Sequence, residues 1–224
     1  MAKWIRNNRG FLAFLVLFGL FRTAVADWNP IPSGSMRPTL LEGDVVFVNR
    51  LAFDLKVPLT NMIVAHLGEP RRGDVVTFFS PRDGLRLIKR LIALPGDTVE
   101  MRDKVLLVNG TAADYRPLGV VVEHPSPGAT VQAFRLYETS GSRTHVVQWL
   151  HLPDGATDDS FGPIVVPSDH YLMLGDNRDD SADSRYFGLV PRQLLIGRAV
   201  AILASADVNA RWAPRFERFG EVLQ

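Results

Sequence analysis

The chain has 224 residues, with 25 basic and 24 acidic side chains, a formal net charge of +1 and no cysteine. A charge this close to zero argues against binding of nucleic acid through a basic face, and the missing cysteine excludes disulfides, thiolate catalysis and Cys-ligated metal centres. Only four of the basic residues are Lys, at positions 3, 56, 89 and 104, and the other 21 are Arg.

The N-terminal segment combines a basic flank with an apolar run. Residues 3–9 hold three basic side chains and no acid, and the apolar run begins at Phe11. One interpretation is a cleaved signal peptide, with residues 24–26 (AVA) as an A-x-A cleavage site. The other is an uncleaved anchor over residues 11–28, which as a helix would span about 27 Å, enough to cross a bilayer core. Either way, the basic tail of residues 1–10 stays in the cytoplasm and the chain from residue 29 lies outside it.

Residues 29–224 read as one mostly β domain. Short apolar stretches rich in Val, Ile and Leu alternate with turns that contain Gly, Asp and Pro. Residues 191–195 favour one short helical turn, and residues 112–168, rich in Pro, Gly, Ser and Thr, predict a looser insertion or subdomain with few strong strands. The predicted strands cover residues 44–48, 74–79, 85–94, 105–108, 146–150, 171–174 and 197–204.

A serine-containing segment follows the N-terminal run, at residues 31–40 (IPSGSMRPTL). Gly34, between Ser33 and Ser35, permits a bend that exposes a hydroxyl, and such a bend suits a nucleophile whose own N–H helps to stabilise an oxyanion. The alternative is a linker between the N-terminal segment and the domain. Neither serine begins an S-x-x-K motif, and the five His lie in no recognisable triad motif, so the candidate base is a Lys.

Lys89 lies in an apolar predicted strand, residues 86–93 (RLIKRLIA). Strand alternation puts it on the same face as Leu87 and other apolar side chains, and burial there would lower its pKa. A pKa near 8 requires roughly 3 kcal/mol of differential interaction, and Arg could not be neutralised in this way. The alternative is an ordinary cation on an edge strand. Lys56 and Lys104 lie beside acids or in turn-like segments and are predicted to be surface cations.

Residues 175–188 (GDNRDDSADSRYFG) form a polar segment after a predicted apolar strand. A calcium loop is disfavoured because Arg178 and Ala182 interrupt the acidic run and no Glu closes it, so we predict no metal and no cofactor. Asp183 and Arg185 are placed to form an ion pair, and Ser181 to make a local hydrogen bond. The alternative is a turn whose polar groups satisfy one another.

Four blocks of the sequence together resemble bacterial type I signal peptidase (leader peptidase), a family of Ser/Lys proteases. The blocks are residues 33–40, 72–74 (RGD), 88–97 and 175–188, in the family's order and with suitable spacing, and the resemblance covers residues from about 22 to 204. It implies a mostly β catalytic domain of antiparallel coiled sheets behind one N-terminal transmembrane helix. Because the match begins within residues 22–28, it favours the retained anchor over a cleaved peptide. Many Gram-negative members carry two transmembrane helices, whereas this chain has room for one.

The resemblance also implies a role for each matched residue. Ser35 matches the nucleophile and Lys89 the general base that deprotonates it. Ser33 matches the side-chain donor to the oxyanion, which acts together with the Ser35 backbone N–H. The residues matched to a supporting role are Ser181, which orients the amine, and the ion pair of Asp183 with Arg185. Candidates to line shallow apolar substrate pockets are Ile31, Met36, Leu40 and Ile88.

The activity implied is removal of N-terminal signal peptides from secreted preproteins, with cleavage after small residues at positions −1 and −3. The expected partners are preprotein signal peptides, the phospholipid bilayer and the secretion translocon, but no nucleic acid. The expected location is the bacterial inner membrane, single-pass, with the N-terminus cytoplasmic and the catalytic domain periplasmic. Two alternatives stay open: a specialised pilin- or conjugation-type Ser/Lys peptidase, and an inactive membrane-tethered binding module. The C-terminal aromatics, Trp212, Phe216 and Phe219, are predicted to pack rather than to contact a membrane.

Overall fold

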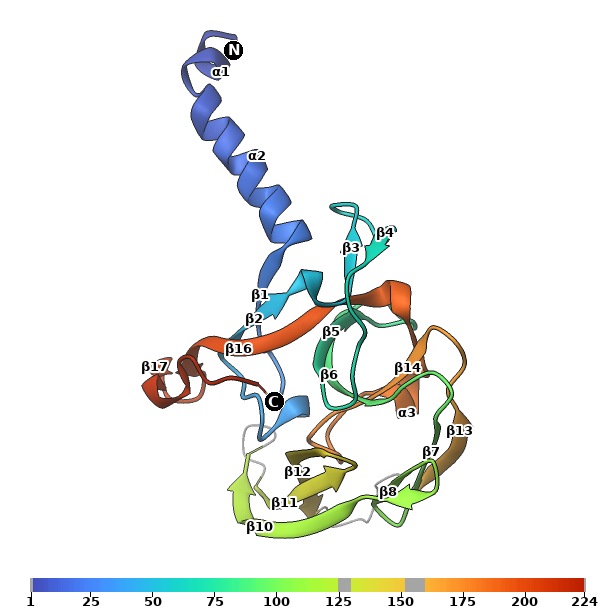
Figure 1. Ribbon diagram of the computed structural model, residues 1–224. Coiled ribbons are helices and arrows are strands. Elements are labelled where there is room, and N and C mark those ends of the chain that lie inside the picture. Colours follow the sequence, from blue (N-terminus) through green and yellow to red (C-terminus); the bar gives the residue numbers. More distant parts are fainter. Residues whose placement is uncertain (1, 125–129, 152–159, 224) are drawn as a thin grey trace.

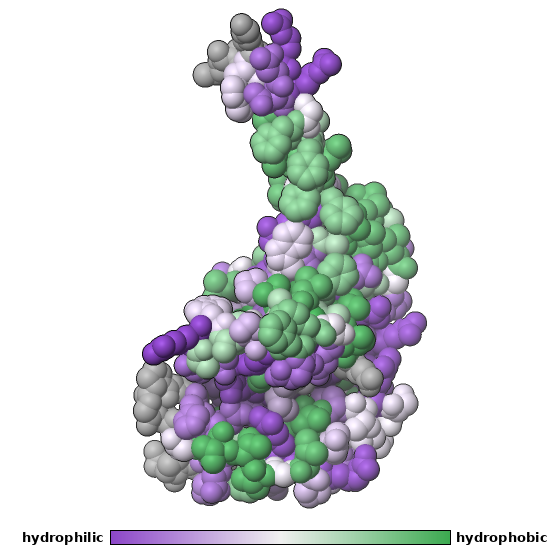
Figure 2. Space-filling model, turned by 90° about the vertical axis from the view of Figure 1, so that its left-hand side faces the viewer, coloured by the Kyte–Doolittle hydropathy of each residue, from purple (hydrophilic) through white to green (hydrophobic). Residues whose placement is uncertain are grey.

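The computed structural model describes residues 2–124, 130–151 and 160–223, and it consists of a helical stalk joined to a β domain (Figure 1). The stalk contains α1 (Ala2–Asn7) and α2 (Arg9–Ala24). No residue of α2 is buried, and Figure 2 shows apolar side chains around this part of the stalk, with hydrophilic ones at its N-terminal end. The apolar run of the sequence therefore forms a helix with an exposed apolar surface.

The helix is shorter than the predicted anchor over residues 11–28. It ends at Ala24, and residues 26–28 belong to strand β1 (Ala26–Pro30), which pairs with β2 (Asp44–Asn49). The backbone groups of residues 26–28 are thus satisfied by a neighbouring strand instead of a further helical turn. Within the described part of the chain, no helix is both long enough and apolar enough to cross a membrane.

The β domain is organised around one antiparallel sheet of eight strands. Its order is β1–β2–β16–β5–β6–β14–β15, with β17 paired to β16. The long strand β16 crosses the domain in Figure 1, and shifts in its register with β2 and β5 mark bulges that bend a strand and curl its sheet. The remaining strands of this sheet are β5 (Val75–Phe79), β6 (Arg86–Ala93), β14 (His170–Leu174), β15 (Val190–Pro191), β16 (Leu195–Asp207) and β17 (Ala213–Pro214).

Two smaller sheets extend the domain. One has the order β13–β7–β8–β9 and the other is the hairpin β3–β4. The turn between β8 and β9 uses Asn109 and Gly110 with φ of 54° and 75°, the left-handed geometry typical of two-residue hairpins. These strands are β3 (Asp54–Lys56), β4 (Ile63–His66), β7 (Thr98–Arg102), β8 (Val105–Val108), β9 (Thr111–Ala112) and β13 (Phe161–Val165).

All seven predicted strand ranges coincide with strands, and the predicted helical turn is confirmed as η3 (Arg192–Leu194). β2 illustrates why these predictions hold, because its side chains alternate between buried and partly exposed along the strand, as a pleated strand requires. The other short helices are η1 (Gly34–Met36), η2 (Arg50–Ala52), α3 (Ser184–Phe187) and η4 (Phe216–Arg218).

The prediction of few strong strands in residues 112–168 is wrong. The stretch holds β10 (Asp114–Glu123), β11 (Val131–Ser140) and β12 (Arg143–His151), which form a three-stranded antiparallel sheet. Pro117 lies on the outer strand, next to a shift in register before Gly119, where the missing N–H of a proline is tolerated. Residues 125–129 and 152–159 of this stretch lie outside the described part of the chain.

The C-terminal aromatic residues differ from the prediction that they pack. Trp212 and Phe216 are 67% and 71% exposed, and the rings of Phe216 and Phe219 contact each other with centroids 5.4 Å apart. Backbone hydrogen bonds to β16, at Ser205 and Ile202, hold this segment, so its position does not depend on burial of its rings.

Candidate active site

The serine segment forms a short 3-10 turn anchored in the apolar core. Ser33 is extended, and η1 carries Ser35 at its centre. Met36 and Leu40 are fully buried in one of the core clusters, together with Ile31. Because buried side chains follow the turn, the partly exposed Ser35 hydroxyl is held at the edge of the core instead of lying in a loose linker.

Lys89 reaches this hydroxyl from the central strand β6. Its side chain is 3% exposed, and its Nζ lies 2.5 Å from Ser35 Oγ. Burial lowers the pKa of Lys89 to about 8, although the charges of nearby aspartates, above all Asp183, oppose that shift. The amine can therefore be neutral at mildly alkaline pH while in direct contact with a serine hydroxyl.

The acidic segment lies directly behind this pair. Asp183 accepts two hydrogen bonds from the Arg185 guanidinium, each 2.8 Å long, and one from the Gly175 N–H. Arg185 also donates to the Arg178 carbonyl at 2.6 Å, so the expected ion pair is present and braces the loop. Ser181 Oγ is buried and makes no hydrogen bond within the described part of the chain.

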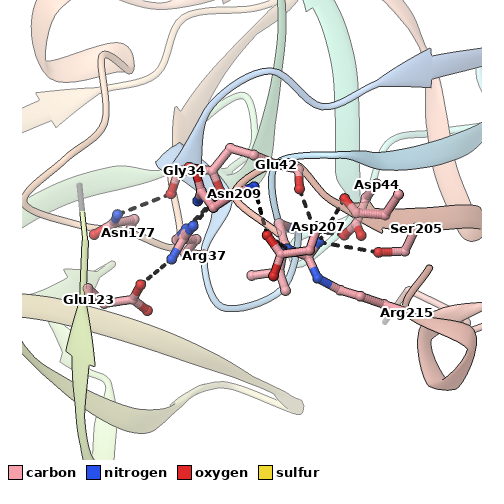
Figure 3. A network of polar contacts seen from close by, with 12 residues as sticks. Gly34, Arg37, Glu42, Asp44, Glu123, Asn177, Ser205, Asp207, Asn209 and Arg215 are labelled. Carbon is pink, nitrogen blue, oxygen red and sulfur yellow. Dashed lines mark hydrogen bonds and ion pairs between the residues drawn. The ribbon is translucent and has the colours of Figure 1, made fainter. Parts of the chain in front are cut away.

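Backbone contacts join the acidic segment to the serine segment. The Asn177 N–H donates to the Ser35 carbonyl at 3.2 Å, and Asn177 Nδ2 donates to the Gly34 carbonyl at 3.0 Å (Figure 3). On the other side of the turn, Arg37 pairs with Glu42 and Glu123. Segments more than 130 residues apart in sequence are thus tied together at the nucleophile candidate.

Buried ion pairs that the sequence reasoning did not find surround the site. Arg90 donates twice to Asp176 at 2.8 Å, and Thr39 Oγ1 donates to the same carboxylate at 2.5 Å. Arg178 donates twice to Glu138, at 2.6 and 2.7 Å. Strand alternation placed Arg90 on the same face as apolar side chains. Because an arginine is rarely buried without an acidic partner, this position could have indicated a buried ion pair.

The four candidates for substrate pockets belong to one cluster. Ile31, Met36 and Leu40 are buried within it, and Ile88 packs against it with partial exposure. Three of them belong to the serine segment itself and are buried, so of the four only Ile88 offers partly exposed surface.

Lys56 is not the ordinary surface cation that was predicted. Its ammonium donates to the carbonyls of Gln193 and Leu195, and burial lowers its pKa to about 8. Lys104 pairs with Asp179 at 3.3 Å and lies over the Trp149 ring. A depressed lysine pKa alone therefore does not identify the base, and among the described lysines the 2.5 Å contact with a serine hydroxyl distinguishes Lys89.

Several known proteins are similar to this chain. A family model described as signal peptidase, peptidase S26, matches residues 1–204. Signal peptidase I of Pseudomonas fluorescens is 32% identical, with 96% of this chain and 78% of that protein covered. Signal peptidase I of Pseudomonas aeruginosa is also 32% identical, with 97% and 79% covered. A crystal structure of a signal peptidase I from Enterococcus faecalis is 31% identical, covers 58% of this chain and 96% of its own, and has a TM-score of 0.35.

The family model spans most of the chain, and the Pseudomonas relatives align over nearly all of it. This chain therefore belongs to the signal peptidase family, peptidase S26.

Proposed function

We propose that the chain is a serine endopeptidase that removes N-terminal signal peptides from exported preproteins, with Ser35 as nucleophile and Lys89 as general base. The observation that carries the proposal is the 2.5 Å contact between Ser35 Oγ and a buried lysine amine. Chemistry of this kind needs a base within hydrogen-bond reach of the hydroxyl and with a pKa near the working pH. Family membership supplies the substrate class.

The reaction runs through an acyl-enzyme. Neutral Lys89 takes the Ser35 proton as Oγ attacks the carbonyl carbon of the scissile peptide bond. The Ser35 N–H and the Ser33 hydroxyl donate to the oxyanion, and Lys89 then returns the proton to the leaving amine as the C–N bond breaks. In the second half, Lys89 takes a proton from water as the water oxygen attacks the ester carbon, and it returns that proton to Ser35 Oγ as the ester C–O bond breaks.

The acidic segment supports this chemistry by position. The family resemblance assigns Ser181 to orient the Lys89 amine, and its buried Oγ has no other hydrogen-bond partner in the described part of the chain. The ion pair of Asp183 with Arg185 holds the loop that carries it in place. Among the pocket candidates, partly exposed Ile88 would contact the small substrate side chains at −1 and −3, whereas the buried Ile31, Met36 and Leu40 would support that surface from within the core.

We further propose that α2 anchors the chain in the bacterial inner membrane. The support is its exposed apolar surface, preceded by the basic flank of residues 3–9, a charge distribution typical of a cytoplasmic N-terminus. The β domain then lies in the periplasm, where preproteins emerge from the secretion translocon.

The dependence of cleavage on pH tests the assignment of the base. We expect kcat/KM to rise about tenfold per pH unit and to level off above about pH 8, because only the neutral amine accepts the serine proton. Asp180→Asn should move the midpoint to lower pH, since the Asp180 charge raises the pKa of Lys89. Initial rates on a preprotein with Ala at −1 and −3 measure both effects. A midpoint near 6.5, the ordinary value for His, would contradict a lysine base.

Gly175 tests the packing of the acidic loop against the nucleophile. A Cβ at Gly175 would lie 2.2 Å from Ser181 Oγ and 2.5 Å from the Ser35 carbonyl oxygen. We expect Gly175→Ala to lower kcat/KM roughly 100-fold, because displacement of catalytic groups by about 1 Å costs that much. Gly19→Ala is the matched control, since a Cβ there meets open space. Equal activity of the two variants would mean that the loop does not position Ser35.

Processing assays also separate the alternatives. Cleavage of several unrelated secretory preproteins favours general signal peptide removal, whereas cleavage of a pilin precursor alone favours a conjugation-type peptidase. An inactive binding module would cut none of them and would leave Ser35 unlabelled by an acylating inhibitor.

A further inference from the structure

A cavity of about 450 Å³ lies where the stalk joins the β domain, away from Ser35 and Lys89. Its wall includes three arginines from separate segments: Arg22 at the end of α2, Arg50 in η2 and Arg86 at the start of β6. The turn between β3 and β4, which points to the same side of the domain as α2 in Figure 1, completes the wall with Leu59, Thr60 and Asn61.

The three guanidinium groups converge on one carboxylate. Asp27 is 4% exposed and pairs with Arg86 at 2.7 Å, Arg22 at 3.0 Å and Arg50 at 3.5 Å. Among the described residues that line the cavity, Asp27 is the only acid, so three positive charges face one negative charge. The cluster keeps a surplus of two positive charges in a partly enclosed space.

This surplus acts on the arginines themselves. Burial lowers the pKa of Arg50, Asp27 raises it, and the neighbouring charge of Arg86 lowers it again. Like charges held close together at low solvent exposure repel one another, and a bound anion relieves that repulsion. Guanidinium groups are also well suited to phosphate, because they donate in pairs with fixed geometry.

The surroundings indicate which anion fits. Arg22 stacks on the Trp28 ring at 4.3 Å, and Phe18 of α2 lies against the same ring, with centroids 6.0 Å apart. Phe21 is 51% exposed and Leu59 is 87% exposed. The cationic cavity lies beside an exposed apolar helix and an amphipathic aromatic side chain. This combination suits a phospholipid, because its phosphate would lie in the cavity while its acyl chains contact the helix.

We propose that Arg22, Arg50 and Arg86 form a binding site for the phosphate of an anionic phospholipid, with its acyl chains along α2. This proposal depends on the membrane attachment proposed above, because the site reaches lipid only if α2 lies in the membrane. It does not depend on the peptidase chemistry. Bound lipid would link the end of α2 to the β domain and so hold the β domain at a fixed distance from the membrane surface. Phosphatidylglycerol should be preferred over phosphatidylcholine, whose choline group cancels the phosphate charge.

Lipid retention by full-length Ser35→Ala protein in non-ionic detergent tests the site independently of cleavage. We expect native mass spectrometry to count one saturable short-chain phosphatidylglycerol, bound at least about tenfold more tightly than the phosphatidylcholine analogue, as expected for charge-assisted hydrogen bonds. Arg50→Gln/Arg86→Gln should lose at least about tenfold in affinity. The matched control is Arg102→Gln/Arg116→Gln, which removes two charges from exposed positions outside the cavity.

A second variant changes the charge in the opposite direction. Asp27→Asn removes the acid that competes with the ligand and should tighten phosphatidylglycerol binding, with thermal unfolding of each variant as the check on folding. Equal binding by Arg50→Gln/Arg86→Gln and its control, or weaker binding by folded Asp27→Asn, would overturn the proposal. Displacement of the lipid by an equal concentration of inorganic phosphate would overturn the assignment to a lipid and indicate a site for soluble phosphate.

Discussion

Replacement of Lys89 by Arg is expected to lower kcat/KM for preprotein cleavage by roughly 10⁴-fold, and Ser35→Ala should be at least as damaging. Arg keeps the positive charge but stays protonated at any working pH, so it cannot take the Ser35 proton. Loss of a nucleophile or its base commonly removes several orders of magnitude in rate. Cleavage of a preprotein by the purified full chain in detergent measures both effects.

The same change at another lysine provides the control. Lys104→Arg also exchanges an ammonium for a guanidinium at a position with an acidic partner, Asp179, and should leave cleavage unchanged. Normal turnover by Lys89→Arg protein would refute the general-base role. The kcat/KM of Ser33→Ala should lie between the values for Lys89→Arg and Lys104→Arg, about 100- to 1,000-fold below that of the unchanged protein. The reason is that this change removes one proposed oxyanion donor but not the nucleophile.

The second large effect concerns stability at the buried pair of Arg178 and Glu138. Both side chains are almost fully buried, and the Tyr115 hydroxyl donates to the same carboxylate at 2.6 Å. We expect Glu138→Gln to lower the free energy of unfolding by about 3–5 kcal/mol, because the variant leaves a buried guanidinium without a counter-charge. Urea unfolding followed by the fluorescence of Trp149, which lies against Arg178, measures this loss.

An exposed ion pair is the matched control. Glu100→Gln breaks the pair with Arg102, whose side chain is 68% exposed, and should cost less than about 1 kcal/mol. A double change of Arg178 and Glu138 to Met should recover much of the loss, since it removes both buried charges. If Glu138→Gln unfolded like the Glu100 control, the pair would not be a main support of the acidic loop.

The contribution of Glu138 to the free energy of unfolding depends on pH in the acid range. The Arg178 charge and the hydrogen bonds to Glu138 hold the pKa of that carboxyl below its ordinary value, against the opposing effect of burial. A carboxylate with a depressed folded pKa contributes stability above its unfolded pKa, near 4.5. That contribution is lost as the pH falls toward the folded value. The Glu138→Gln deficit should therefore shrink in acid.

Local patterns were sufficient for much of the fold. Short apolar stretches rich in Val, Ile and Leu between turn signals predicted seven strands, and β8 coincides with its predicted range, because buried strands bounded by turns produce that pattern directly. Of the sheet β10–β12, only residues 146–150 of β12 were predicted, and β10 and β11 were missed because Pro117 and Gly119 interrupt β10 and polar residues are frequent along β11. Pairing between the three strands holds this sheet together.

Local patterns marked the two principal site candidates, and the resemblance of the four sequence blocks to a family assigned their roles. Lys89 was notable as a lysine on an apolar strand in a chain that otherwise favours arginine, and Ser35 as a hydroxyl beside Gly34 between prolines. Their 2.5 Å contact, across 54 residues of sequence, depends on how β6 and the serine turn pack together.

Tertiary structure alone decided the partners of the buried charges. Nothing in the local sequence of Arg90 indicates Asp176, and Lys56 has an acidic neighbour in sequence yet donates to carbonyls near residue 194. The junction cavity likewise joins three arginines from α2, η2 and β6 around Asp27. Sequence by itself determined most of the strand positions and marked the candidate catalytic residues, because propensity and side-chain type are local properties. Burial, pairing and the resulting pKa values depend on distances across the fold, and those arise only when the sheets pack.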